Sequence, residues 1–199
     1  MQPNNKHQMY ALYPTPLLVS SLKNDATLQE VRDTLLRVTF GPTPRTWGKT
    51  HKISYSAPGA APFGDDIISY LGMTLLDQEL HNIVAGFCAH TGVDYRPFTR
   101  TSWFSLFEPG DYGHVHTHSP CDISGCVYVE TDGEDGSIFF LTPNIPMANS
   151  REYAHMTTSH KVKPEAGRVL VFPSFMEHGI QTNESQHRRI SLAFNLTFK

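Results

Sequence analysis

The stretch TSWFSLFEPGDYGHVHTHSPCDISGCVYVE, residues 101–130, decides the fold class of this chain. Two segments rich in β-branched and aromatic residues, Thr101–Phe107 and Ile123–Glu130, are separated by the turn sequence Glu108-Pro-Gly-Asp111 and by a histidine-rich segment. Short runs of this composition, bounded by Gly, Pro and Asp, are typical of β-strands. Three more follow, at Ser137–Leu141, Val169–Phe172 and Ile190–Phe198. We therefore expect a mainly β protein, with a double-sheet jelly roll in its second half.

The first half of the sequence predicts helices and loops. Residues Ala26–Val38 have helical apolar spacing, and Thr27-x-x-Glu30 has the form of a capping box at their start. A stronger helical face follows, ended by Gly92; its apolar members are Leu76, Leu80, Ile83, Val84, Phe87 and Cys88. Between the helices, Gly41–Gly64 is rich in Pro, Gly, Ser and Thr and reads as a long loop. A loop of that length is either a lid or binding segment, or disordered.

At 199 residues the chain is expected to form one domain, 1–199. Within it, residues 1–97 would be a helical and loop support region packed on one face of the jelly roll. Residues 98–199 would be the jelly-roll core, which also contains the candidate metal ligands.

Composition excludes several classes of function. The net charge is −3 and no positive cluster stands out, so we expect no nucleic-acid partner and no anionic membrane surface. No apolar run approaches the ~20 residues of a membrane span. The opening residues lack a basic region followed by an apolar stretch, so we expect no secretory signal. Three cysteines are too few for a disulfide framework and indicate free thiols in the cytoplasm.

Histidines provide the main functional signal. His114, His116 and His118 alternate, so on a strand all three would point to one side. Imidazole rings are poor core material but good ligands for Fe, Zn, Cu and Ni. His178 follows the Val169–Phe172 strand, and a β-sandwich can bring such a distant ligand beside the first group. His114 taken alone is best interpreted as a surface residue.

A second candidate site lies eleven residues after His178. Arg189 and Ser191 alternate onto one face of the last predicted strand, whereas Arg188 faces the other way. A guanidinium and a hydroxyl on one face are suited to bind a carboxylate, because arginine can engage both carboxylate oxygens.

Three stretches resemble the 2-oxoglutarate/Fe(II) oxygenases of bacteria and cyanophages. Residues 102–129 resemble the family pattern W-x-N…H-x-H-P…S-G-V-Y-Y. Residues 164–178 resemble P-x-x-G-x-L-x-x-F-P-S-x-x-x-H, and 189–195 resemble R-I-S-x-x-F-N. Tyr13-Pro-Thr-Pro16 is similar to the usual start. The resemblance is strong from 102 to 195 and thin in the middle of the chain.

This resemblance implies a double-stranded β-helix, the cupin-like form of the jelly roll, with Fe(II) and 2-oxoglutarate as cofactors. The wider superfamily holds iron with H-x-D/E…H. His116 and His178 match the two histidines, and His118 occupies the carboxylate position. His118 is the first choice for the third ligand, Asp122 the alternative and His114 the last choice; a site with two protein ligands is also open. The far carboxylate of 2-oxoglutarate would meet Arg189 and Ser191, assisted by Tyr128.

The expected function is hydroxylation of a small-molecule or peptidyl substrate with O₂. Halogenation, desaturation and cyclisation use the same machinery. One alternative is a three-histidine iron dioxygenase of cupin type that needs no 2-oxoglutarate; another is a non-enzymatic metal- or ligand-binding jelly-roll module. The sequence leaves open whether the chain forms a homodimer. It also does not name the substrate, because the loops that would select it, Gly41–Gly64 and Asn144–His160, have no readable motif.

Overall fold

The computed structural model describes residues 14–43, 50–55, 65–144, 150–152 and 159–199. Its helices are α1 (Asp25–Thr34), η1 (Leu35–Arg37, a 3-10 helix), α2 (Ile67–Leu71) and α3 (Thr74–Thr91). Its strands in the first half and the centre are β1 (Leu18–Ser21), β2 (Thr39–Pro42), β3 (Lys52–Tyr55), β4 (Phe98–Phe107), β5 (Gly113–His116) and β6 (Ile123–Glu130). The remaining strands are β7 (Ile138–Phe140), β8 (His160–Val162), β9 (Arg168–Pro173), β10 (His178–Ile180) and β11 (Arg189–Phe198).

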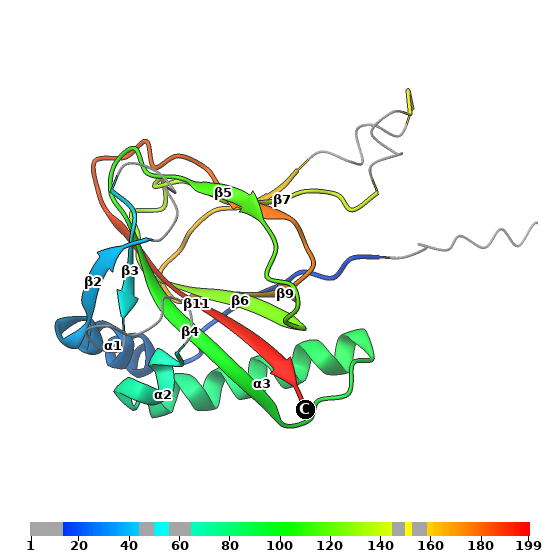
Figure 1. Cartoon of the computed structure of the whole chain (residues 1–199), viewed down its shortest axis with the longest axis horizontal. Coiled ribbons are helices and arrows are strands. Elements are labelled where there is room, and N and C mark those ends of the chain that lie inside the picture. Colours follow the sequence, from blue (N-terminus) through cyan, green and yellow to red (C-terminus); the bar gives the residue numbers. More distant parts are fainter. Residues whose placement is uncertain (1–13, 44–49, 56–64, 145–149, 153–158) are drawn as a thin grey trace, which may run out of the picture.

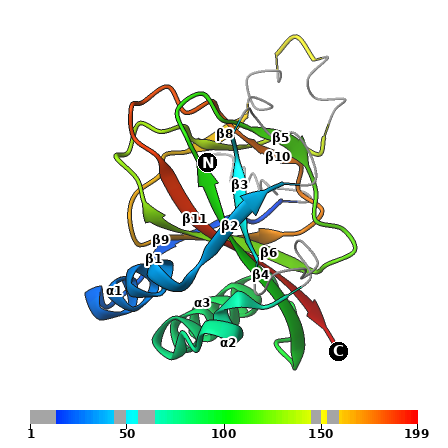
Figure 2. The ribbon, with the colours of Figure 1, turned by 60° about the vertical axis from the view of Figure 1, so that its left-hand side comes forward.

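The strands form two antiparallel sheets. The large sheet has the order β1-β9-β6-β11-β4-β3-β2, and the small sheet has the order β5-β10-β7-β8. Figure 1 shows helices α1, α2 and α3 against one side of the large sheet and the small sheet on its other side. The turned view in Figure 2 separates the same layers, with β5, β8 and β10 together above the large sheet. The predicted mainly β jelly roll with helices on one face is confirmed.

Two hydrophobic clusters follow from the alternation of side chains along the central strands. On β6, Val127 and Val129 pack into the cluster beneath the helices, whereas Tyr128 packs into the cluster between the sheets. Strand β9 divides in the same way, with Val171 on the helix side and Leu170 between the sheets. Because both faces of these strands are buried, both positions of the alternation are apolar, and the register is strongly specified.

The two predicted helices are confirmed, but the predicted capping box is wrong. The side chain of Asn24 caps α1 by accepting from the backbone N–H of Ala26 at 2.9 Å. Glu30 instead reaches the other helix, where its carboxylate accepts from the backbone N–H groups of Leu75 at 3.2 Å and Leu76 at 3.0 Å. These N–H groups lie in the first turn of α3 and have no partner within that helix, so Glu30 caps α3 from α1.

The expected long loop at Gly41–Gly64 is wrong in part. The end of β2 and all of β3 lie within it; the two strands pair with each other, and β3 also pairs with β4 through Lys52 and Leu106. Together with β1 they extend the large sheet, so the first half of the chain supplies three strands as well as helices. Residues 44–49 and 56–64 of that segment, and most of Asn144–His160, lie outside the described residues.

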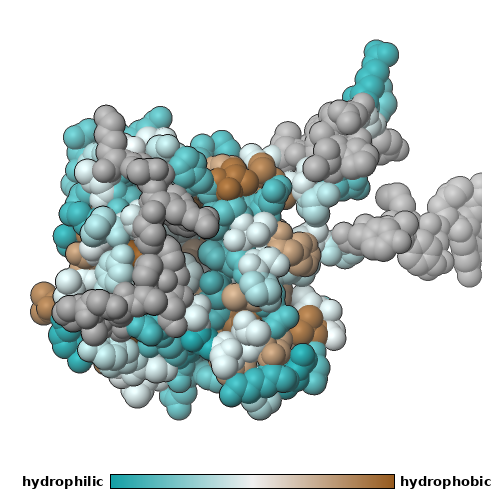
Figure 3. Space-filling view, in the orientation of Figure 1, coloured by the Kyte–Doolittle hydropathy of each residue, from teal (hydrophilic) through white to brown (hydrophobic). Residues whose placement is uncertain are grey.

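Among the described residues, no helix is both long and apolar enough to cross a membrane. The face of the molecule in Figure 3 is largely hydrophilic, and the hydrophobic side chains visible there form separate areas.

Candidate functional site

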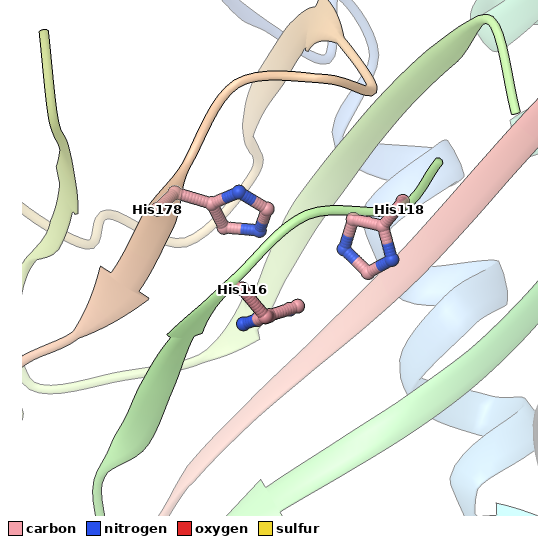
Figure 4. Close-up of side chains that lie close together, drawn as sticks. All are labelled: His116, His118 and His178. Carbon is pink, nitrogen blue, oxygen red and sulfur yellow. The ribbon is translucent and has the colours of Figure 1, made fainter. Parts of the chain in front are cut away.

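Three histidines come together between the two sheets. His116 ends β5, His178 begins β10, and the two residues are directly paired across these antiparallel strands. His118 lies two residues beyond the end of β5, where its backbone N–H donates to the carbonyl of Ser174 at 2.9 Å. One ligand atom from each ring lies within 4.8 Å of those of the other two. Figure 4 shows the three rings facing a common space.

His114 does not join this group, although strand alternation predicts that it faces the same way as His116. The reason is a β-bulge: Gly113 and His116 are three positions apart on β5, whereas their partners Ile180 and His178 are two positions apart on β10. An extra residue on one strand interrupts the alternation of side chains. His114 is exposed and its ring makes an edge contact with Tyr112 at 5.0 Å.

Backbone carbonyls fix the orientation of two of the rings. Nδ1 of His116 lies 2.7 Å from the carbonyl oxygen of His114, and Nδ1 of His178 lies 2.9 Å from that of Met176. A carbonyl oxygen can only accept, so each neutral ring carries its proton on Nδ1 and its lone pair on Nε2. Figure 4 shows Nε2 of His178 turned toward His118. This arrangement is typical of histidines that bind metals.

The local environment keeps the rings neutral. Burial, His178 and His116 together lower the pKa of His118 from 6.5 to about 3. Burial and His116 also lower the pKa of His178 to about 4, against the opposite effect of its bond to Met176. At neutral pH these rings are therefore uncharged, which is the form that binds metal.

Asp122, the alternative ligand, lies away from the histidine group. Its residue is exposed and its carboxylate accepts from the backbone N–H of Phe198 at 2.8 Å, at the end of β11. Among the described residues, the group of His, Cys, Asp and Glu side chains with metal-binding geometry contains only the three histidines.

A cavity of about 60 Å³ joins the histidine group to the second candidate site. It is lined by the three histidines and by Tyr128, Arg189 and Ser191. The structure therefore brings together the residues that the sequence suggested for metal and carboxylate binding, apart from the alternatives Asp122 and His114.

Arg189 is almost fully buried, with 1% of its surface exposed. Its Nη1 donates to the carbonyls of Asp135 at 3.0 Å and Gly136 at 2.6 Å, and its guanidinium lies 4.4 Å from the centre of the Phe107 ring. Nε and Nη2 are also buried but have no hydrogen-bond partner among the described residues. Buried charged donors without acceptors are costly, so these two N–H groups favour an anionic ligand in the cavity.

The neighbouring Arg188 behaves differently, as the alternation predicts. It is exposed and pairs with Glu130 at 3.0 Å. Arg189 has a carboxylate nearby as well, because Oδ1 of the buried Asp135 lies 3.8 Å from its Nη1. No local sequence signal relates Asp135 to Arg189, so the sequence did not identify this contact.

Other cavity residues were not predicted. Trp103, Ser105 and Phe107 line the wall from alternate positions of β4, and that alternation is the signal that could have identified them. Cys126 lies on β6, two residues before Tyr128, and also lines the cavity. Burial raises the pKa of the Cys126 thiol to about 12, so it remains protonated.

The jelly-roll half of the chain is similar to a known family of enzymes. Residues 101–195 match the family model described as "Putative 2OG-Fe(II) oxygenase", where 2OG is 2-oxoglutarate. The match covers 95 of the 199 residues and includes both candidate sites. It supports a 2-oxoglutarate/Fe(II)-dependent oxygenase, an enzyme that uses Fe(II), 2-oxoglutarate and O₂ to oxidise a substrate. No curated protein sequence gives a significant match to this oxygenase.

Solved structures share the fold of this oxygenase at low sequence identity. A Pseudomonas putida prolyl-4-hydroxylase is 16% identical over 93% of this chain and 94% of its own, with a TM-score of 0.61. HygX from Streptomyces hygroscopicus, with nickel and 2-oxoglutarate bound, is 15% identical over 93% and 84%, with a TM-score of 0.62. A 2OG-Fe(II) oxygenase family oxidoreductase from Burkholderia pseudomallei is 11% identical over 91% and 84%, with a TM-score of 0.65. These similarities concern the fold.

Proposed function

We propose that His116, His118 and His178 hold the Fe(II) of this oxygenase. Three features support the assignment: the convergence of one ligand atom from each ring, the neutral state of His118 and His178, and the carbonyls that direct Nε2 of His116 and His178 away from the backbone. Imidazole is a suitable ligand for iron. The third ligand would then be a neutral ring where the wider superfamily has a carboxylate, so the protein ligands would contribute no negative charge.

In this proposal, Arg189, Ser191 and Tyr128 bind the far carboxylate of 2-oxoglutarate. The observation that carries the function is the pair of buried, unpartnered N–H groups on Arg189, in the same cavity as the histidine group. Tyr128 is buried at the same wall, and burial raises the pKa of its hydroxyl, which therefore stays protonated and can donate. A dicarboxylate with one end at the metal and the other at Arg189 would complete both sites.

Bound Fe(II) and 2-oxoglutarate supply the oxidising power for attack on a C–H bond of the substrate. The residues of the chain hold the ligand atoms, neutralise the far carboxylate and restrict water to a small cavity. We propose hydroxylation of a small-molecule or peptidyl substrate as the outcome. Cytoplasmic localisation and the absence of nucleic-acid and membrane partners stay predictions from the sequence, and the possible homodimer stays open.

The three-histidine ligand set is also what a cupin-type dioxygenase without 2-oxoglutarate would need. Such an enzyme would have no use for a buried arginine with two unpartnered N–H groups beside the metal. A non-enzymatic jelly-roll module would leave the same arginine unexplained. Arg189 therefore distinguishes the proposed cosubstrate site from both alternatives.

The test is anaerobic addition of Fe(II) and then 2-oxoglutarate to the purified protein. A metal-to-ligand charge-transfer band in the visible spectrum requires 2-oxoglutarate to chelate the iron, so the band is expected with wild type. Succinate, which lacks the 2-oxo group, is the matched control and should give no band. Stoichiometric Fe(II) binding without a band at saturating 2-oxoglutarate would reject the proposal in favour of the three-histidine dioxygenase.

A further inference from the structure

Behind His118, on the side away from the cavity, lies a chain of three buried polar side chains. Nδ2 of Asn195 is 3.4 Å from Nδ1 of His118. Oδ1 of Asn195 accepts from the hydroxyl of Ser124 at 2.7 Å, and that hydroxyl is 2.7 Å from the hydroxyl of Ser174. Exposed fractions are 8% for Asn195, 1% for Ser124 and 0% for Ser174. None of the three lines the cavity, and the hydrogen bond that joins these side chains to the site is the one from Asn195 to His118.

The topology of the large sheet brings these side chains together. Asn195 on β11 is directly paired with Ser124 on β6, and Ser174 follows the last residue of the neighbouring β9. Ser174 also accepts the backbone N–H of His118 through its own carbonyl at 2.9 Å. The chain therefore connects the His118 ring to the segment that leads into His178.

His118 differs from the other two histidines in the partner of its Nδ1. His116 and His178 face backbone carbonyls, which can only accept and therefore fix the proton on Nδ1. Nδ1 of His118 faces a side-chain amide, which can donate from its nitrogen or accept at its oxygen. The tautomer of His118 is thus determined by the orientation of Asn195.

Metal binding by His118 requires its ring proton to lie on one particular nitrogen. With Nδ2 of Asn195 toward the ring, Nδ1 of His118 accepts, and the ring proton lies on Nε2. Figure 4 shows that this second nitrogen points toward the other two histidines, whereas the first faces β11. A ring that binds metal through Nε2 must instead carry its proton on Nδ1. Asn195 must then turn its oxygen toward the ring.

The two serines make this reversal possible. When the amide turns by 180°, its Nδ2 faces Ser124. The hydroxyl of Ser124 can accept this hydrogen bond and donate another to the hydroxyl of Ser174. A hydroxyl both donates and accepts, so each link between the three side chains is kept with the opposite direction. A carboxylate at position 118 would always accept and would never need the reversal.

We infer that Asn195 is a positioning residue for the metal site, which selects the metal-binding tautomer of His118 through a reversible hydrogen-bond chain with Ser124 and Ser174. This inference rests on the proposed role of His118 as a ligand. An outer partner that sets the tautomer of a ligating histidine typically changes metal affinity by about 10- to 100-fold. Asn195 is therefore predicted to affect metal binding without touching the metal.

The test is titration of the metal-free protein with Co(II), followed by its visible absorption, in four variants. Asn195→Leu, which can neither donate nor accept, should weaken Co(II) binding by about 10- to 100-fold. Asn195→Asp, whose carboxylate accepts from Nδ1–H without turning, should stay within about threefold of wild type. His118→Ala is the reference for loss of the ligand. Thr197→Val, two residues along the same strand and exposed, is the control and should match wild type.

The possible outcomes test the role of Asn195 separately from the proposed role of His118 as a metal ligand. Wild-type affinity in His118→Ala would overturn the ligand assignment. Loss in His118→Ala together with wild-type affinity in Asn195→Leu would overturn the role of Asn195 alone. Equal losses in Asn195→Leu and Asn195→Asp would show a merely structural role and also overturn it. If Asn195→Leu does not fold, Asn195→Asp and Ser124→Ala decide: the first must retain Co(II), and the second must lose affinity severalfold.

Discussion

Replacement of Arg189 by alanine tests the cosubstrate site most directly. The substitution removes two buried N–H donors that have no partner in the described part of the chain, at a position with 1% of its surface exposed. Solvent screening is small at such a position, and a charge-assisted hydrogen bond contributes about 1.5–3 kcal/mol. Since 1.4 kcal/mol corresponds to a factor of ten, 2-oxoglutarate should bind about ten- to a hundredfold more weakly.

The assay is anaerobic calorimetric titration of the Fe(II)-loaded protein with 2-oxoglutarate. Arg188→Ala is the matched control, because Arg188 is the adjacent residue but is exposed and paired with Glu130 at 3.0 Å. Its affinity for 2-oxoglutarate should equal that of wild type. Since Arg189→Ala also leaves Asp135 without its cation, thermal unfolding and Fe(II) binding of the variant should be measured alongside. Equal losses in the two variants, or wild-type affinity in Arg189→Ala with iron bound, would refute the reasoning.

Four further predictions concern the metal ligands and the stability of the fold. His178→Ala should abolish loading at stoichiometric Fe(II), and full iron retention in anaerobic titration would remove His178 from the site. His118→Ala should lose iron while Asp122→Ala keeps it; the reverse result would make Asp122 the ligand. Glu30→Ala should lower the free energy of unfolding by about 0.5–2 kcal/mol, because the N-terminus of α3 loses its cap, and an unchanged urea midpoint would contradict this. Burial lowers the pKa of His51 from 6.5 to about 4, so between these pH values the unfolded chain binds a proton that the folded protein does not. The free energy of unfolding of the metal-free protein should therefore fall as the pH falls through that window, and less steeply in His51→Gln; identical slopes in urea titrations at stepped pH would exclude His51 as a cause.

Local sequence was sufficient where the deciding interactions lie within one segment. The predicted strand Ile123–Glu130 coincides with β6. Its β-branched and aromatic residues fit a buried sheet, and turn residues mark both of its ends. The end of α3 was predicted equally well, because Gly92 adopts the left-handed conformation that ends the helix. The edge strand β2 and its neighbour β3 were missed because their composition resembles that of a loop. The pairing of β2 with β3, and of β3 with β4, supplies the missing preference.

The residue types of the candidate site, their spacing and their family pattern were determined by the sequence alone. The tertiary structure decided which of them share one cavity. A bulge in β5 separates His114 from His116, and no composition signal reports a bulge. Glu30 caps a helix that begins more than forty residues later in the sequence. Asp135 lies beside Arg189, and the side chain of Asn195 on β11 lies beside that of His118. The physical reason is common to all of these: side chains far apart in the sequence meet only through the register of the strands and the packing of the layers, which local preferences do not encode.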